Sequence, residues 1–114
     1  MVKIVEKEIA MDELKNMSEK MFGNLVKAVV DTEKEIMAVD AELHSDEEAL
    51  LLEKGSIQAN LWGINIYPEM SGEDFVEFDS MINLRPSQEN RSRGVENPEI
   101  RKKINQIVDK LVKK

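Results

Sequence analysis

The densest group of side chains suited to binding lies in residues 85–93, here called the arginine loop. It contains Arg85, Asn90, Arg91 and Arg93. Guanidinium groups carry several N–H donors in a planar fork that matches carboxylate or phosphate oxygens. We therefore expect these four residues to bind an anion or an acidic partner. The alternative, which the charge balance slightly favours, is that the arginines pair with carboxylates of this chain or of a second copy.

His44 is the only histidine of the chain and starts the string HSDEE. A helix through this string would place His44 on one face with Glu47 and Glu48, at a spacing that suits a metal site. The simpler interpretation is preferred. Acidic residues complement the first turn of a helix, and Ser45 with Glu48 forms a capping box. No metal ligand is therefore predicted.

Glu77 and Asp79 stand two residues apart on one predicted strand and could lie near Asn65 across a hairpin. Paired carboxylates can act in acid–base chemistry when one of them is desolvated, but on a solvated sheet they remain ordinary ionised groups. We prefer the second interpretation. Trp62 next to Gly63 could form a recognition pocket, but tryptophan in a strand is more often part of a core. No catalytic residue is predicted.

The composition excludes several classes of protein. The chain has no cysteine, so it has no disulfide, thiolate metal site or cysteine nucleophile. It contains no glycine-rich nucleotide motif and no G-x-S-x-G elbow, so no cofactor is expected. Its longest apolar runs are four residues. A membrane span or a signal peptide needs a longer run, so we expect a soluble, cytoplasmic protein.

The charges are divided unevenly along the 114 residues. Residues 1–84 hold 19 acidic residues against 7 lysines, a net charge of −12, whereas residues 85–114 hold 9 basic residues against 4 acidic ones, a net charge of +5. All four arginines lie in the second segment. The overall charge of −7 disfavours general binding to nucleic acid without excluding it, because it repels the phosphate backbone.

Periodicity and turn residues predict one α+β domain over residues 1–114. The predicted sheet is mainly antiparallel, has about five strands and is covered by three helices in the order β-α-β-β-α-β-β-α. The strands are expected at residues 2–9, 25–30, 35–39, 61–67 and 76–84. The helices are expected after Asp12, after Ser45 and after Asn97, with Gly23 and Gly55 following the first two.

Leu50, Leu51 and Leu52 are consecutive within the second predicted helix. At about 100° per residue they spread over about 200° of the helix surface, which one sheet face cannot cover. We therefore expect this helix to be buried on two sides, either beneath the C-terminal helix or against a second subunit.

Four strings, ELHSDEEALLLEKGS, LWGINIYP, EFDSMINLRP and NRSRGVENPEIRKKI, run in order through the chain. Together they resemble a family of small uncharacterised bacterial and archaeal proteins, filed as a domain of unknown function. The resemblance implies a prokaryotic single-domain protein and carries over no catalytic residue. It also leads us to expect glycine at two positions near the predicted hairpin, where this chain has Glu35 and Asp40.

Two functions remain open from the sequence. The first is a non-catalytic binding module that self-associates, for example as a homodimer, or that holds an acidic partner through the arginine loop. The alternative is a small metal-dependent hydrolase acting on phosphorylated or nucleic-acid substrates, with Asp31, Glu47 and Asp79 as metal ligands. No enzyme motif supports the alternative, and the sequence identifies neither a ligand nor a pathway.

Overall fold

The computed structural model describes every residue from Met1 to Lys114. None of its helices combines the length and the apolar composition that crossing a bilayer requires. The elements in chain order are β1 (Lys3–Val5), β2 (Ile9–Ala10), α1 (Met11–Lys20), β3 (Val26–Asp31), β4 (Ile36–Val39), α2 (His44–Glu53), η1 (Gln58–Asn60), β5 (Leu61–Ile66), η2 (Gly72–Asp74), β6 (Val76–Glu77), η3 (Met81–Asn83), η4 (Pro86–Gln88), α3 (Pro98–Leu111) and β7 (Val112–Lys113).

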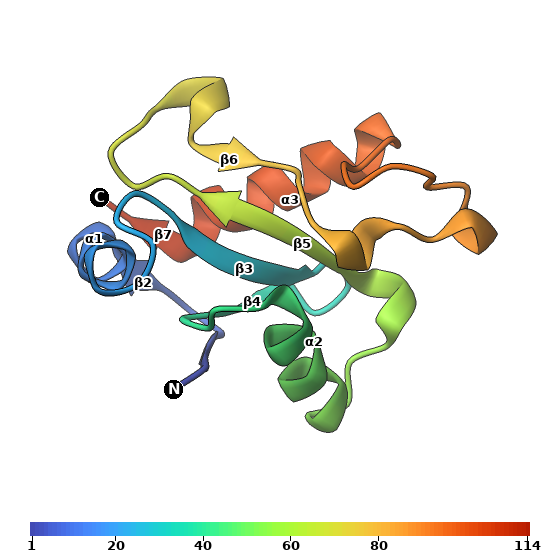
Figure 1. Ribbon diagram of the computed structural model, residues 1–114, viewed down its shortest axis with the longest axis horizontal. Helices are drawn as coiled ribbons and strands as arrows, with labels where there is room; N and C mark the ends of the chain where they lie inside the picture. The colour runs from blue at the N-terminus through green and yellow to red at the C-terminus, as the bar shows by residue number, and fades with distance from the viewer.

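Five strands form one sheet in the order β1-β4-β3-β5-β6, and every neighbouring pair is antiparallel. A separate parallel pair, β2 with β7, joins the two ends of the chain. The predicted α+β class, with a five-stranded antiparallel sheet and three helices, is confirmed (Figure 1).

The two faces of the sheet are covered to different extents. On one face, α1 and α3 complete a core of 19 buried residues, in which α3 contributes Ile104, Ile107, Val108 and Leu111. On the other face, α2 contributes Leu51 to a cluster of only four buried residues. Figure 1 shows α3 and α2 on opposite sides of the strands. The face under α2 is therefore only partly closed.

Helix α2 begins two residues earlier than the sequence predicts. Its first residue is His44, and its N-cap, Leu43, makes no side-chain hydrogen bond. The predicted capping box of Ser45 and Glu48 is therefore wrong. The physical reason is that Glu48 faces Arg85, with 3.6 Å between Oε2 and Nη2. The predicted stop is confirmed, because Gly55 has a φ of +101° directly after the helix.

The three leucines of α2 are not all buried. Leu51 is fully buried, whereas Leu52 is 40% exposed. Because α3 lies across the opposite face of the sheet, the expectation that α2 lies beneath the C-terminal helix is wrong. Packing of α2 against a second subunit stays a prediction.

The N-terminal prediction was partly wrong. The expected strand over residues 2–9 is interrupted, so that β1 pairs with β4 while Ile9 of β2 pairs with Val112 of β7. Helix α1 then starts at Met11 with Ala10 as its N-cap, and Asp12 lies in its first turn. The predicted N-cap of α3 is confirmed, because Oδ1 of Asn97 accepts a hydrogen bond from the backbone N–H of Glu99.

The β3–β4 hairpin bends where the resemblance led us to expect glycine. Glu35 has a φ of +57° and Asp40 a φ of +72°, the left-handed conformation that glycine adopts most easily. The turn before Glu35 is held by Asp31, whose Oδ1 accepts the backbone N–H groups of Glu33 and Lys34, each at 2.9 Å.

Candidate functional site

A cleft of about 470 Å³ opens on the partly covered face of the sheet. It lies where the first turn of α2 meets β3, β5, β6 and η3, and we call it the His44 cleft. Its polar lining residues are Lys27, His44, Ser45, Asn65, Tyr67, Glu77, Asp79, Ser80 and Arg93. Leu25, Leu43, Met81 and Ile82 form its apolar part.

Strand register places three of these side chains in one row across the sheet. Lys27 of β3 is directly opposite Asn65 of β5, and Asn65 is directly opposite Glu77 of β6. Cross-strand partners have Cβ atoms about 4.5–5.5 Å apart, so their side chains interact. The row therefore forms the floor of the His44 cleft.

His44 is held at the entrance of the cleft by the backbone of β5. It is 7% exposed, and its Nε2 lies 2.7 Å from the carbonyl oxygen of Ile64. Since a carbonyl can only accept, Nε2 carries the proton and Nδ1 presents a lone pair with no partner in the chain. Burial lowers the pKa of His44, and the charge of Lys27 lowers it further. The ring is therefore neutral at neutral pH.

Glu77 accepts two hydrogen bonds on one of its oxygens. Asn65 Nδ2 donates to Oε1 at 2.9 Å, and the Tyr67 hydroxyl donates to the same atom at 2.8 Å. The bond to Glu77 favours the protonated phenol and raises the pKa of Tyr67. Asn65 Oδ1 is buried and has no hydrogen-bond partner. The prediction that Asn65 lies beside Glu77 and Asp79 is confirmed.

Asp79 pairs with Arg93, whose Nε lies 2.6 Å from Oδ1. Both side chains are about half exposed, at 42% and 54%. An exposed pair of this kind contributes about 0–1 kcal/mol to stability. It orients the Arg93 side chain over the cleft, and the terminal nitrogens of the guanidinium form no bond within the chain.

Asn83 replaces a strand along the outer edge of β5. Its Oδ1 accepts from the backbone N–H of Gly63 at 2.8 Å, and its Nδ2 donates to the Gly63 carbonyl at 3.0 Å and to the Arg93 carbonyl at 2.9 Å. This explains why β6 ends at Glu77, although the sequence predicts a strand as far as residue 84. The close approach needs Gly63, because a Cβ there would lie 2.6 Å from Ser80.

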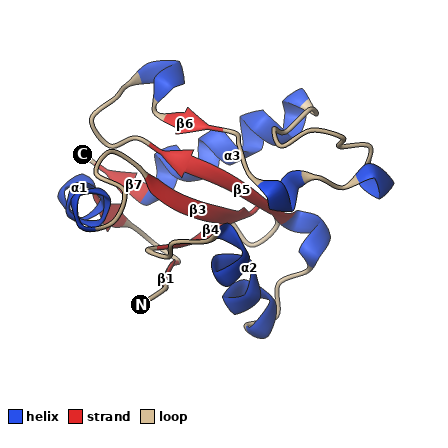
Figure 2. Cartoon of the chain, viewed as in Figure 1, coloured by secondary structure: helices blue, strands red, loops and turns tan.

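Asn90 fixes the end of the arginine loop from inside. It is 3% exposed, and its Nδ2 donates to three backbone carbonyls, those of Asn83, Ser92 and Gly94. Its Oδ1 accepts from the backbone N–H of Glu96 at 2.8 Å. Between β6 and α3 the only regular elements are the short helical turns η3 and η4, and the rest of the segment is loop (Figure 2). Side-chain bonds therefore take the place of regular secondary structure there.

Arg85 is also internal. It is 9% exposed, it donates through Nη2 to the Leu61 carbonyl, and its guanidinium lies 4.9 Å from the ring centre of Trp62. The predicted core role of Trp62 is confirmed, because the indole is 2% exposed. The space beside Gly63 is filled by Ser80.

The four predicted loop residues thus divide into two pairs. Arg85 and Asn90 bind the chain itself, whereas Arg91 and Arg93 are exposed. No contact of the Arg91 side chain with an acidic residue is present. Only these two arginines are therefore positioned to reach another molecule.

The carboxylates of the hydrolase alternative do not meet. Asp31 is used in the hairpin turn and accepts from Ser56 Oγ at 2.6 Å. Glu47, a residue of α2, is fully buried and accepts from the Ala41 N–H at 3.2 Å. Burial raises the pKa of Glu47 to about 10, so it is protonated. No group of three or more His, Cys, Asp or Glu residues is arranged to hold a metal ion.

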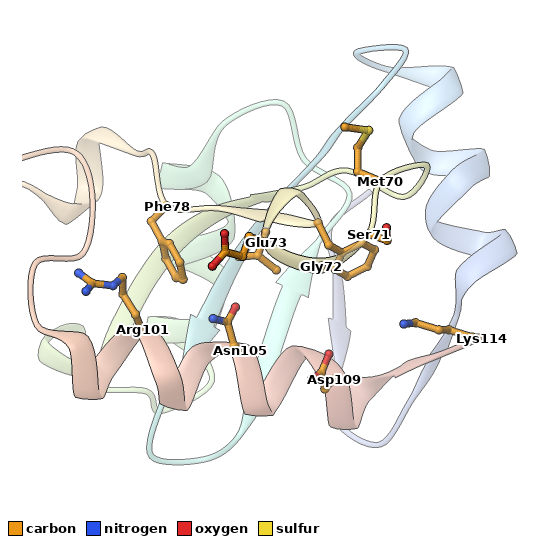
Figure 3. Close-up of a pocket in the computed structure, with 11 residues that line it drawn as sticks. Met70, Ser71, Gly72, Glu73, Phe78, Arg101, Asn105, Asp109 and Lys114 are labelled. Atoms are coloured by element: carbon orange, nitrogen blue, oxygen red, sulfur yellow. The ribbon is translucent and has the colours of Figure 1, made fainter.

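A second cleft, of about 770 Å³, lies between the η2 turn and α3 and is shown in Figure 3. We call it the α3 cleft. Asn105 and Asp109 project into it from α3, and Glu73 lies on the opposite side. None of these three side chains makes a hydrogen bond, and all three are exposed. Arg101 alone is held, by bonds to the Val95 and Glu96 carbonyls.

The sequence over residues 3–111 matches the family described as "Protein of unknown function (DUF5674)". The chain belongs to this family. No curated protein and no solved structure matches the chain. Membership in DUF5674 assigns no activity, so the roles of site residues rest on their geometry.

Sequence reasoning missed Lys27 and Tyr67 as members of the site. A signal was present, because Lys27 and Asn65 are the polar positions inside two otherwise apolar runs, VKAVV and LWGINI. Such a position in a central strand needs a polar partner or a solvent opening. The register that aligns them could not be read from the sequence.

Proposed function

We propose that this protein is a non-catalytic binding module that holds carboxylates of an acidic protein surface through Arg91 and Arg93. The observation that carries the proposal is the internal bonding of the arginine loop. Buried side chains of Asn83, Arg85 and Asn90 fix its backbone. A loop fixed in this way presents its outward side chains with little loss of entropy on binding.

The chemistry of the outward pair defines the partner. Guanidinium groups bind carboxylates by paired, charge-assisted hydrogen bonds, and Arg91 has no such partner within the chain. Leu43 and Met81 line the His44 cleft together with Arg93, and they are 54% and 61% exposed. An apolar area next to charged donors is typical of a protein interface.

A second copy of the chain supplies one such surface. Residues 1–84 carry a net charge of −12. Complementary charge accelerates association and makes it depend on salt. Self-association as a homodimer is therefore included in the proposal, beside another acidic protein.

A fluorescein-labelled hexaglutamate peptide, blocked at both ends, tests the proposal by fluorescence anisotropy. We expect binding at ~20 mM NaCl that weakens strongly at ~500 mM, where the screening length is short. The double variant Arg91→Ala, Arg93→Ala should lose most of this binding. The control Lys7→Ala, Lys102→Ala removes the same charge from exposed positions elsewhere and should retain it.

Absence of binding at low salt, or equal loss in the two double variants, contradicts the proposal. Light scattering over a range of concentrations then identifies the partner. A dimer mass at low salt that the arginine variant lacks indicates a second copy. A monomer mass under all conditions assigns the surface to a different protein.

A further inference from the structure

The His44 cleft contains a buried hydrogen-bond acceptor, Asn65 Oδ1, that nothing in the chain satisfies, and a second unbonded acceptor on the His44 ring. Asn65 is 7% exposed, and its Nδ2 is bonded to Glu77 while its Oδ1 has no partner. His44 is also 7% exposed, with Nε2 bonded to Ile64 and Nδ1 unbonded. Buried polar atoms without a partner are rare in native proteins, because each carries a desolvation cost. Asn65 Oδ1 therefore needs a donor from outside the chain, and His44 Nδ1 offers a second acceptor in the same cleft.

Two cations line the same cleft. Lys27 forms no ion pair within the chain and lies 5.2 Å from the ring centre of Phe22. Arg93 uses Nε for Asp79, and its two terminal nitrogens remain without a partner. Positive groups thus stand beside neutral acceptors within about 470 Å³. The two carboxylates of the same cleft already have partners, since Glu77 accepts from Asn65 and Tyr67 and Asp79 pairs with Arg93.

The complementary ligand carries a carboxylate next to an N–H donor. An aspartate or glutamate residue within a peptide has this combination, because its side chain is anionic and its own backbone supplies the N–H. A cleft of this size is within the range of ligand pockets. The α3 cleft offers no such pairing, since none of its polar side chains is buried.

We propose that the His44 cleft receives one aspartate or glutamate residue of the acidic partner. Its carboxylate binds Lys27 and Arg93, and its backbone N–H donates to Asn65 Oδ1 or His44 Nδ1. This inference rests on the proposed function and adds to it a specific pocket and a specific residue type.

Two peptides of equal charge separate the inference from general electrostatic attraction. The first is the blocked hexaglutamate, and the second is the same peptide with methylated backbone nitrogens, which lacks the N–H donors. We expect the first to bind roughly tenfold more tightly to the wild-type protein, because the methylated peptide leaves the buried Asn65 Oδ1 unsatisfied.

A second test of the inference uses a substitution that fills the His44 cleft. Ser45→Trp places an indole at a lining position on the exposed first turn of α2. Ala49→Trp adds the same group one turn further along the helix, at an exposed position outside the cleft lining. We expect Ser45→Trp to abolish the difference between the two peptides and Ala49→Trp to retain it. Circular dichroism checks that both variants are folded.

The results distinguish failure of the proposed function from failure of the inference alone. If the wild-type protein binds neither peptide, or if binding ignores Arg91 and Arg93, the proposed function fails and the inference fails with it. If the arginine variant loses binding but the wild-type protein holds both peptides equally, the inference alone fails. It is likewise overturned if Ser45→Trp leaves the tenfold difference intact.

Discussion

The two clefts of this molecule differ in construction more than in size. The α3 cleft, at about 770 Å³, is larger than the His44 cleft, at about 470 Å³. Glu73, Asn105 and Asp109 in the larger cleft are exposed side chains without hydrogen bonds. In the smaller cleft, His44 and Asn65 are more than nine-tenths buried and each is fixed by a hydrogen bond.

This difference supports the proposal that the acidic partner binds in the His44 cleft. Side chains that are already ordered lose little conformational freedom when a ligand binds, whereas exposed ones must be immobilised. The His44 cleft also lies on the sheet face that only α2 covers. Polar groups on this face can therefore be largely buried and still border an open cleft. Volume alone would select the α3 cleft, whereas the ordered polar side chains favour the His44 cleft.

The strongest test of this comparison is the removal of Asn83, which fixes the wall of the His44 cleft. Asn83→Ala leaves the N–H and the carbonyl of Gly63 without partners. We expect the free energy of unfolding to fall by about 3–5 kcal/mol. Asn105→Ala, in the α3 cleft, should change it by less than about 0.5 kcal/mol. Urea denaturation measures both, and equal effects would remove the structural distinction between the clefts.

The pH dependence of stability tests whether the space between α2 and the sheet, where Glu47 is buried, excludes water. Burial raises the pKa of Glu47 to about 10 in the folded chain, from an ordinary value of 4.5. A raised folded pKa stabilises the folded state fully below pH 4.5, and this contribution is lost as the pH rises toward 10. We expect the free energy of unfolding to fall by up to about 1.4 kcal/mol per pH unit between about pH 5 and pH 9.

Glu47→Gln should remove this pH dependence and should be more stable than the wild-type protein at about pH 8. Glutamine keeps an oxygen that can accept from the Ala41 N–H. Glu53→Gln, at an exposed position of the same helix, serves as the control and should leave the dependence unchanged. A wild-type slope that persists in Glu47→Gln would show that this carboxyl is hydrated.

Substitution of Gly63 tests how closely β5 packs against Ser80, in the segment after β6. A Cβ at this position would lie 2.6 Å from Ser80, so Gly63→Ala should destabilise the protein by about 1–3 kcal/mol. Gly94→Ala is the matched control, because a Cβ there would meet its nearest atom at 3.4 Å. Thermal unfolding should separate the two variants, and similar melting temperatures would mean that the packing around Gly63 is loose.

The smallest expected effect on stability comes from Arg93. Its pair with Asp79 is about half exposed, so Arg93→Ala should cost less than about 1 kcal/mol. The same change should reduce hexaglutamate binding, since Arg93 lines the cleft and its terminal nitrogens have no partner in the chain. Urea denaturation and fluorescence anisotropy of the same Arg93→Ala sample measure both effects. A variant that unfolds at a lower urea concentration but binds the peptide normally would assign Arg93 a structural role.

The fold class could be predicted from the sequence because it depends on local periodicity. The apolar stripe of α3 and its cap at Asn97 gave the last helix correctly. The stop of β6 could not be predicted, since Asn83 bonds to a backbone twenty residues away without any periodic signal. Asn83 bonds the backbone of Gly63 as a neighbouring strand would, but in the sequence it is one polar residue like any other.

The candidate site was predicted only in part, for a similar reason. The exposed arginines and the pairing of Glu77 with Asn65 were visible as residue types and spacing. The burial of Arg85 depends on the carbonyl of Leu61 and on the indole of Trp62, which only the folded chain brings together. The row of Lys27, Asn65 and Glu77 depends on the register of three strands.

The most direct measurement of the central claim is an amide NMR titration of the wild-type protein with the blocked hexaglutamate peptide. We expect the largest shift changes at Lys27, His44, Asn65 and Arg93, which line the His44 cleft. We expect no change at Gly72, Asn105 and Asp109, which line the larger cleft. Shifts concentrated on these last three residues, or spread evenly over the basic surface, would contradict the assignment of binding to the His44 cleft.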